Sequence, residues 1–107
     1  MKKFLGIVFL VILSQGIYAQ EQTWEYPFIK ALNYEERQEW NLAIEELEKS
    51  RALQEENLFV LKELGYCYAK QGEWEKAKEC YEKVLFFYPE DSNAKKNLEI
   101  LLENKTK

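Results

Sequence analysis

Apolar residues between positions 58 and 85 recur three or four places apart, which is the spacing of one face of an α-helix. One stripe contains Leu58, Leu61, Leu64, Gly65 and Tyr68, and a second contains Trp74, Ala77, Tyr81, Val84 and Leu85. Asn57 suits the N-cap of the first helix, and Gly72 suits the left-handed residue that ends many helices. Pro89 closes the second stripe, because the residue before a proline avoids the helical conformation. The pattern predicts two amphipathic helices.

The same pattern occurs twice at an offset of 34 residues. Tyr34 aligns with Tyr68, Trp40 with Trp74, Ala43 with Ala77, and Ala31 with Gly65. We therefore predict repeat 1 over about residues 24–57 and repeat 2 over about residues 58–91. A helix pair buries its apolar face only by stacking on another pair, so the repeat predicts an all-α fold, a short α-solenoid of antiparallel helix pairs.

A further apolar stripe follows Pro89 and predicts a C-terminal capping helix over about residues 92–104. Its members are Ala94, Leu98, Leu101 and Leu102. Asp91 or Ser92 is suited to be its N-cap. The opposite face of this helix is polar, as expected for the last element of a stack.

The second unit resembles the tetratricopeptide repeat. It reads Leu61-x-x-Leu64-Gly65-x-x-Tyr68, then Ala77-x-x-x-Tyr81, then Pro89, with the spacings of that family. The first unit departs from the pattern at five positions. Pro27 replaces a large apolar residue, and Lys30 replaces a leucine. The turn glycine is replaced by Gln38, the aromatic residue by Leu47, and the closing proline by Glu55. Tyr34, Trp40 and Ala43 remain. The resemblance implies a tetratricopeptide-like domain over residues 20–107, with Pro27 in the first turn of an irregular first helix.

In this family the first helices of each pair line a concave groove that holds a peptide or helix of a partner protein. The resemblance implies that Phe28, Leu32, Phe59, Lys62, Tyr66 and Lys70 face that groove, together with Glu35, Glu36, Ala69, Lys96 and Ile100. Phe59 and Tyr66 are aromatic anchors outside the core pattern; the alternative is that they pack on a neighbouring helix. One branch of the family clamps a terminal carboxylate, but Phe28, Leu32 and Glu63 occupy its Lys and Asn positions, so that activity is not expected.

The first residues have the three parts of a secretory signal peptide. Lys2 and Lys3 are followed by an apolar run from Phe4 to Leu13, and the small residue Ala19 precedes Gln20. A bilayer needs about 20 apolar residues, and this run is shorter. We therefore expect residues 1–19 to be a signal peptide cleaved after Ala19, which implies a periplasmic or secreted protein. An uncleaved membrane anchor is the alternative.

Few residues could carry chemistry. The chain has no histidine, which removes the usual general base and the commonest metal ligand, and its four glycines form no phosphate-binding motif. We expect Glu45, Glu46 and Glu48 to form a solvated helix face. Cys67 and Cys80 are interpreted as buried thiols, with a disulfide or a redox pair as alternatives. No catalytic residue, metal site or cofactor is predicted.

Charge and size bear on the partners. The net charge is −4, and Lys2 and Lys3 lie in the segment expected to be removed, so a nucleic acid is disfavoured. Two repeats and a cap give a small core, which favours a homodimer or docking on a larger protein. We therefore interpret the chain as a non-enzymatic protein–protein interaction module of the cell envelope, an adaptor or assembly factor. The alternative is a membrane-anchored structural subunit that retains its apolar start and contacts the membrane only for that reason.

Overall fold

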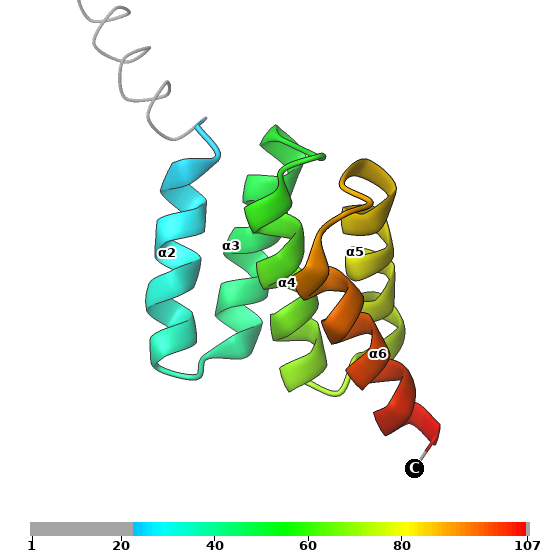
Figure 1. The fold of residues 1–107 in the computed structure, drawn as a ribbon. Helices are drawn as coiled ribbons and strands as arrows, with labels where there is room; N and C mark the ends of the chain where they lie inside the picture. Colours follow the sequence, from blue (N-terminus) through cyan, green and yellow to red (C-terminus); the bar gives the residue numbers. More distant parts are fainter. Residues whose placement is uncertain (1–22, 107) are drawn as a thin grey trace, which may run out of the picture.

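A computed structural model describes residues 23–106, and the side chains up to residue 104. The described chain is all-helical, as predicted (Figure 1). Its helices are α2 (Glu25–Glu36), α3 (Trp40–Leu53), α4 (Leu58–Lys70), α5 (Trp74–Phe87) and α6 (Ser92–Thr106). The predicted signal peptide lies outside the described residues. None of the described helices is long and apolar enough to span a bilayer.

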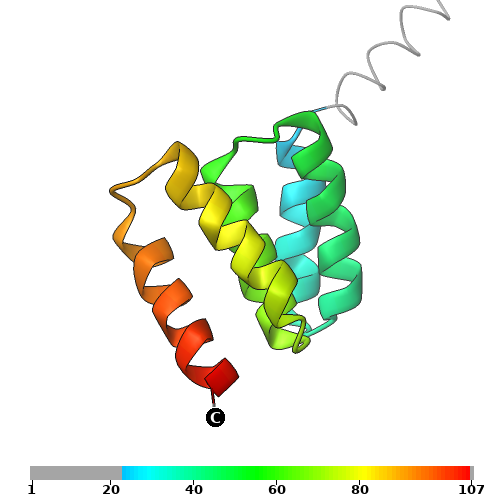
Figure 2. The same ribbon diagram turned by 90° about the vertical axis from the view of Figure 1, so that its right-hand side faces the viewer.

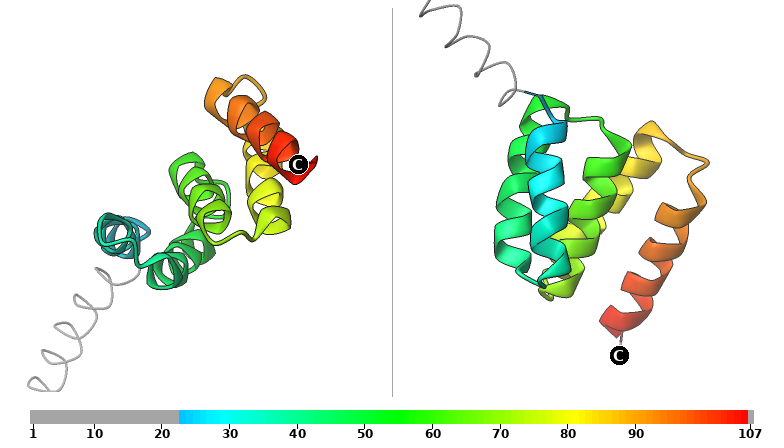
Figure 3. Two further views of the ribbon diagram at one scale, coloured as in Figure 1. Left: turned by 90° about the horizontal axis from the view of Figure 1, so that it is seen from below. Right: turned by 90° about the vertical axis from the view of Figure 1, so that its left-hand side faces the viewer.

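The helices form antiparallel pairs that stack in two layers. α2 packs against α3 and α4 against α5, while α3 also meets α4 and α5 also meets α6. Seen along the helix axes, α2, α4 and α6 form one layer, and α3 and α5 form the other (Figure 3, left). Figure 2 shows α6 lying against α5 at the end of the stack. This arrangement leaves the α2/α4/α6 layer uncovered by other described helices.

Helix α4 holds the stack together because it buries two faces. Val60, Leu64 and Cys67 pack into a core shared with α2, α3 and α5, and all three are fully buried. Leu61 belongs to a second core that includes Tyr81 of α5 and Leu101 of α6. Burial of a large apolar side chain contributes about 1.5–3 kcal/mol. The apolar residues of α4 therefore link both pairs, which explains why its sequence is more hydrophobic than that of the other helices.

Gly65 allows α4 and α5 to approach each other closely. A Cβ atom at this position would lie 2.7–3.0 Å from three ring atoms of Tyr81. The Tyr81 ring is itself buried, at 3% exposure. The aromatic ring of α5 thus occupies the space that a side chain at position 65 would need, which is the packing role that the repeat pattern assigns to this glycine.

The turns inside the two pairs repeat the same hydrogen bonds. The N–H of Glu39 donates to the Tyr34 carbonyl at 2.9 Å, and the N–H of Glu73 donates to the Tyr68 carbonyl at 2.9 Å. Each of these turns contains one residue with a left-handed backbone conformation: Gln38, with φ 59°, in the first and Gly72, with φ 76°, in the second. Gly72 confirms the predicted turn. Gln38 adopts the same conformation without glycine's freedom, at a cost of about 1–2 kcal/mol.

The caps of the longer connections follow the sequence. The Asn57 side chain accepts hydrogen bonds from the N–H groups of Phe59 and Val60, at 3.0 and 3.1 Å. The Asp91 side chain accepts one from the N–H of Ala94 at 2.8 Å, so Asp91 rather than Ser92 caps α6. Both side chains satisfy N–H groups that have no partner inside the helix.

The first pair replaces two apolar contacts of the second pair with polar ones. Lys30 stands at the position of Leu64, and it lies 3.9 Å from Glu46, which stands at the position of Cys80. Ser50 stands at the position of Val84, and its hydroxyl donates to the Trp24 carbonyl at 2.7 Å. These residues close the first unit with an ion pair and a hydrogen bond. Pro27 lies in the first turn of α2, as predicted.

The expectation of a solvated glutamate face is wrong for one of its residues. Glu45 is exposed, but Glu46 is only 7% exposed and lies 3.0 Å from the ammonium group of Lys49. Glu48 is half-buried and accepts a hydrogen bond from the Tyr68 hydroxyl at 2.8 Å. Of the three, only Glu46 stands where the second unit has a core residue, Cys80, and its carboxylate is paired with lysines instead.

Helix α6 buries Ala94 and Leu101 and half-buries Leu98, whereas Leu102 is exposed. Leu102 aligns with Tyr68, which faces α5, and no described helix packs on the corresponding side of α6.

The equivalent residues Trp40 and Trp74 differ in their surroundings for a related reason. The rings of Trp40 and Tyr66 form a T-shaped pair with centroids 5.8 Å apart, whereas Trp74 is 40% exposed and Ile100 stands at the equivalent of Tyr66.

Both cysteines are free thiols buried in the same core. Burial raises the pKa of each, that of Cys80 to about 12. The thiolate is the reactive form of cysteine, so both side chains behave as small core residues.

Substituting Gly65 with alanine should destabilise the fold, because the new methyl group meets the Tyr81 ring. We expect the free energy of unfolding to fall by about 1–3 kcal/mol. In a Tyr81→Leu background the ring is absent, and the same substitution should become neutral or stabilising, since alanine is favoured over glycine inside a helix by about 1 kcal/mol. Chemical denaturation of the four proteins measures both effects. Equal costs in the two backgrounds would show that the close contact has no role.

Candidate functional site

An open groove of about 660 Å³ lies on the α2/α4/α6 layer. Its lining residues come from every described helix and combine aromatic, apolar, acidic and amide side chains. They are Leu32, Glu35, Glu36, Trp40, Lys62, Glu63, Tyr66, Tyr81, Asn93 and Asn97. Because α4 is flanked by α2 and α6 in this layer (Figure 3, left), residues far apart in the sequence line one hollow.

The structure brings some of the predicted groove residues together. Leu32, Lys62 and Tyr66 line the groove, as do Glu35 and Glu36. Lys70 does not line it, but its ammonium group lies 5.3 Å from the centre of the Tyr66 ring. Tyr66 is 43% exposed, although its ring also meets Trp40. Both interpretations of Tyr66 therefore hold in part: it packs on a neighbour and presents an edge to the groove.

The structure places the remaining predicted residues elsewhere. Phe28 packs against the first core, with its ring 5.4 Å from that of Trp24. Phe59 is exposed and lines a different hollow, at the turn between α3 and α4. Ala69, Lys96 and Ile100 are also not among the residues that line the groove. Phe59 lies in the first turn of α4, about two helical turns before Tyr66, which separates the two side chains along the helix.

A pair of carboxyl groups lies in the groove between α2 and α4. One oxygen of Glu35, Oε2, is enclosed and has no hydrogen-bond partner when the group is a carboxylate. Burial, a hydrogen bond to Glu63 and repulsion from its charge raise the pKa of Glu35 from 4.5 to about 8. A proton on Glu35 accounts for these facts, because the protonated carboxyl donates to the Glu63 carboxylate.

The lysine of the groove is held by an ion pair. The ammonium group of Lys62 lies 2.6 Å from a carboxylate oxygen of Asp91, and both side chains are mostly buried. Partial burial opposes ionisation of Asp91, but hydrogen bonds from Lys62 and from the Ala94 N–H lower its pKa below the ordinary 3.8. Asp91 thus neutralises Lys62 and caps α6 with the same carboxylate. The groove keeps little free positive charge.

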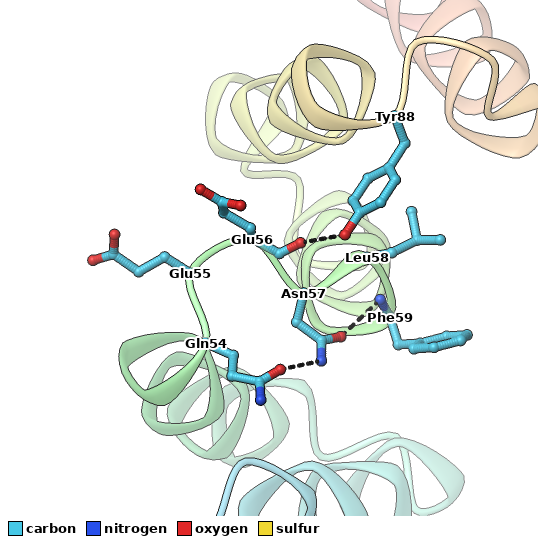
Figure 4. Close-up of a pocket in the computed structure, with 7 residues that line it drawn as sticks. All are labelled: Gln54, Glu55, Glu56, Asn57, Leu58, Phe59 and Tyr88. Atoms are coloured by element: carbon cyan, nitrogen blue, oxygen red, sulfur yellow. Dashed lines mark hydrogen bonds between the residues drawn. The ribbon is translucent and has the colours of Figure 1, made fainter.

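A second hollow lies at the other end of α4, where the chain turns from α3 (Figure 4). Its lining residues are Gln54, Glu55, Glu56, Asn57, Leu58, Phe59 and Tyr88. The Tyr88 hydroxyl donates to the Glu56 carbonyl at 2.9 Å, which ties the end of α5 to this turn. This hollow measures about 710 Å³, but all of its lining residues except Tyr88 belong to the single segment 54–59.

Within residues 23–106 there is no group of three or more side chains able to hold a metal ion. The groove presents aromatic walls, amide groups and carboxyl groups. Such a surface suits binding of an extended or helical polypeptide.

Sequence reasoning missed several groove residues. The sequence pattern identifies Trp40 only as a repeat position and Tyr81 only as part of an apolar stripe, and it assigns no role to Asn93 or Asn97. The offset of 34 residues could have found the asparagines, because it places Asn93 and Asn97 at the positions of Phe59 and Glu63. Glu63 does line the groove, at a position where a carboxylate clamp would need an asparagine.

Comparisons with known proteins agree with this architecture. Residues 59–91 match the tetratricopeptide repeat family. A search of curated protein sequences finds no significant match. Two crystal structures of MamA have TM-scores of 0.77 and 0.76, each with 27% sequence identity over 79% of this chain. The chain spans about half of each MamA chain, 50% and 46%.

A further solved structure is the first tetratricopeptide domain of Spaghetti (RPAP3), bound to the HSP90 peptide SRMEEVD. Its TM-score is 0.79 with 20% identity, over 88% of this chain and 75% of that chain, which shows a shared fold. The match at residues 59–91 supplies the sequence signature, and α2, α3 and α6 extend the same packing on both sides. Residues 59–91 are therefore a tetratricopeptide repeat, and the described chain as a whole has a tetratricopeptide-like fold.

Proposed function

We propose that the protein binds a peptide or helix of a partner protein in the α2/α4/α6 groove and acts as a non-enzymatic adaptor or assembly factor. The observation that carries the proposal is the groove itself, a hollow of about 660 Å³ with exposed Leu32 and Tyr66 at its surface. Aromatic side chains that are already held in place make effective anchors, because little conformational entropy is lost on binding. Trp40 holds Tyr66 in this way.

The structural relatives support peptide binding as the mode of action. The RPAP3 domain has the same fold and holds a peptide of HSP90. The groove of this chain is long enough to contact α2, α4 and α6 at once, so a bound segment would bridge both helix pairs. We propose that the partner is a protein segment and not a small molecule, because the hollow is open and its lining is spread over several helices.

We further propose that the protein works in the cell envelope, in the periplasm or after secretion. The support is the charged, apolar and small-residue order of residues 1–19, with cleavage after Ala19. In the alternative proposal the apolar start is retained and anchors a structural subunit of an envelope complex. A second copy of the chain remains a candidate partner in either case.

A photo-crosslinking amino acid at position 66 tests the groove. Expressed in its native cell, the protein with the crosslinker in place of Tyr66 should give one discrete adduct, because the partner covers this edge of the ring. The matched control places the crosslinker at Lys83, which is exposed on α5 in the other layer. Substituting Leu32 with alanine should weaken the adduct. Adducts of equal yield from both layers, or none from position 66, would contradict groove binding.

The mass of the intact protein distinguishes the two locations. We expect the protein purified from its native cell to begin at Gln20, in a soluble envelope fraction. An Ala19→Arg variant should be retained at full length, since a small residue is required before the cleaved bond. A full-length mass for the unaltered protein, found with the membrane, would favour the anchored subunit.

A further inference from the structure

The charges of the groove are unbalanced toward the acidic side. Glu35, Glu36 and Glu63 line it, and its lysine, Lys62, is neutralised by Asp91. Lys70 lies nearby but over the face of Tyr66 rather than in the lining. The other polar lining groups, Asn93 and Asn97, are uncharged. A partner segment that enters this hollow therefore meets a negative surface with aromatic walls.

Glu35 and Glu63 are the focus of this charge. Glu35 comes from α2 and Glu63 from α4, so the two carboxyl groups face each other across the helix boundary. Cys67 of α4 faces the same carboxyl, Tyr81 of α5 lies near Glu63, and Glu36 adds a charge on the α2 side. None of these groups supplies a positive charge. Two carboxyl groups this close to each other share one proton unless a cation separates them.

We propose that the groove recognises a partner segment that inserts a lysine or arginine side chain between Glu35 and Glu63. The cation replaces the proton that Glu35 holds in the free protein, and that proton passes to the solvent. Both carboxylates are then ionised and paired with one positive charge. The inference rests on the proposed function and adds to it the chemical class of the partner, a basic protein segment.

The walls of the groove suit the rest of such a side chain. The aliphatic stem of lysine or arginine can lie along Leu32 and the ring edge of Tyr66, while the charged end reaches the carboxyl groups. Cations already associate with aromatic rings at this end of the molecule, since the ammonium of Lys70 lies 5.3 Å from the centre of the Tyr66 ring. A segment with net negative charge, such as the SRMEEVD peptide of the RPAP3 complex with its one arginine and three acidic residues, would instead be repelled.

The shared proton is tested first in the free protein. The folded-state pKa of Glu35 lies above its ordinary value, so the contribution of this group to stability is full below pH 4.5 and is lost as pH rises from 4.5 to 8. The Tm of the unaltered protein, relative to that of Glu35→Gln, should fall across this window and level off above it. The chain has no histidine, so few other groups titrate there.

The control for this measurement is Glu36→Gln, which changes the neighbouring exposed carboxylate. Its Tm should run parallel to that of the unaltered protein across the window. If the Tm of the unaltered protein and that of Glu35→Gln changed in parallel with pH, the claim of a shared proton would be contradicted.

The binding claim is tested with a display library of short randomised peptides. Selection on the unaltered protein should enrich lysine or arginine at one position beside apolar residues. The enriched sequence, resynthesised with arginine or with neutral citrulline at that position, and SRMEEVD then serve as probes in calorimetry. We expect only the arginine peptide to bind, with release of up to about one proton per peptide. Its affinity should increase as the pH is raised toward 8, by up to about tenfold per pH unit.

Two double variants complete the design. Glu35→Gln with Glu63→Gln should abolish the preference for arginine over citrulline. Glu45→Gln with Glu82→Gln removes the same number of carboxyl groups from exposed sites outside the groove lining and should leave this preference unchanged. Enrichment of uncharged or acidic peptides, or arginine binding that survives the first double variant, would overturn this inference and leave peptide binding intact. Selection of no peptide at all would overturn both this inference and the proposed groove.

Discussion

The stack depends on α4 being buried on two sides. Its residues Val60, Leu64 and Cys67 face the first core, and Leu61 faces the second, so neither helix pair closes without it. The close approach of α4 and α5 requires that position 65 carry no side chain, because the Tyr81 ring fills that space. Once α4 is fixed between α3 and α5, its remaining side faces outward in line with α2 and α6. The groove is a consequence of this packing.

The fold could be predicted from the sequence because the residues that make the main packing contacts occur twice, at an offset of 34 positions. Tyr34 and Tyr68, and Ala43 and Ala77, fix the helix pairs at equivalent positions, and the structure repeats even the turn hydrogen bonds at Glu39 and Glu73. Glu46 was not readable in this way. A glutamate beside two other glutamates resembles a solvated face, but the packing of α2 on α3 buries Glu46 and places Lys30 of α2 3.9 Å from it. Such pairs are set by tertiary contact and not by local pattern.

The groove was only partly predictable for a similar reason. The resemblance to the family indicated the layer of α2, α4 and α6, and Leu32, Lys62 and Tyr66 do line a hollow on that layer. It did not distinguish Tyr66 from Phe59, which lie two turns apart on one helix but face different hollows. Charge in the groove also depends on pairing that the sequence does not state: Lys62 is neutralised by Asp91, and Glu35 meets Glu63. Pairing with Asp91 cancels the positive charge of Lys62, and the proton on Glu35 removes one negative charge, so the charge of the groove depends on these contacts.

The central claim is that α4 joins the two helix pairs into one cooperative unit that presents the groove. Native-state amide hydrogen exchange tests this most directly, because it measures the free energy of opening for each helix. We predict that the interior amides of α3, α4 and α5 exchange with one common free energy, equal to that of global unfolding. Opening of the α2–α3 pair at a clearly lower free energy, while α4 and α5 stay protected, would contradict the claim.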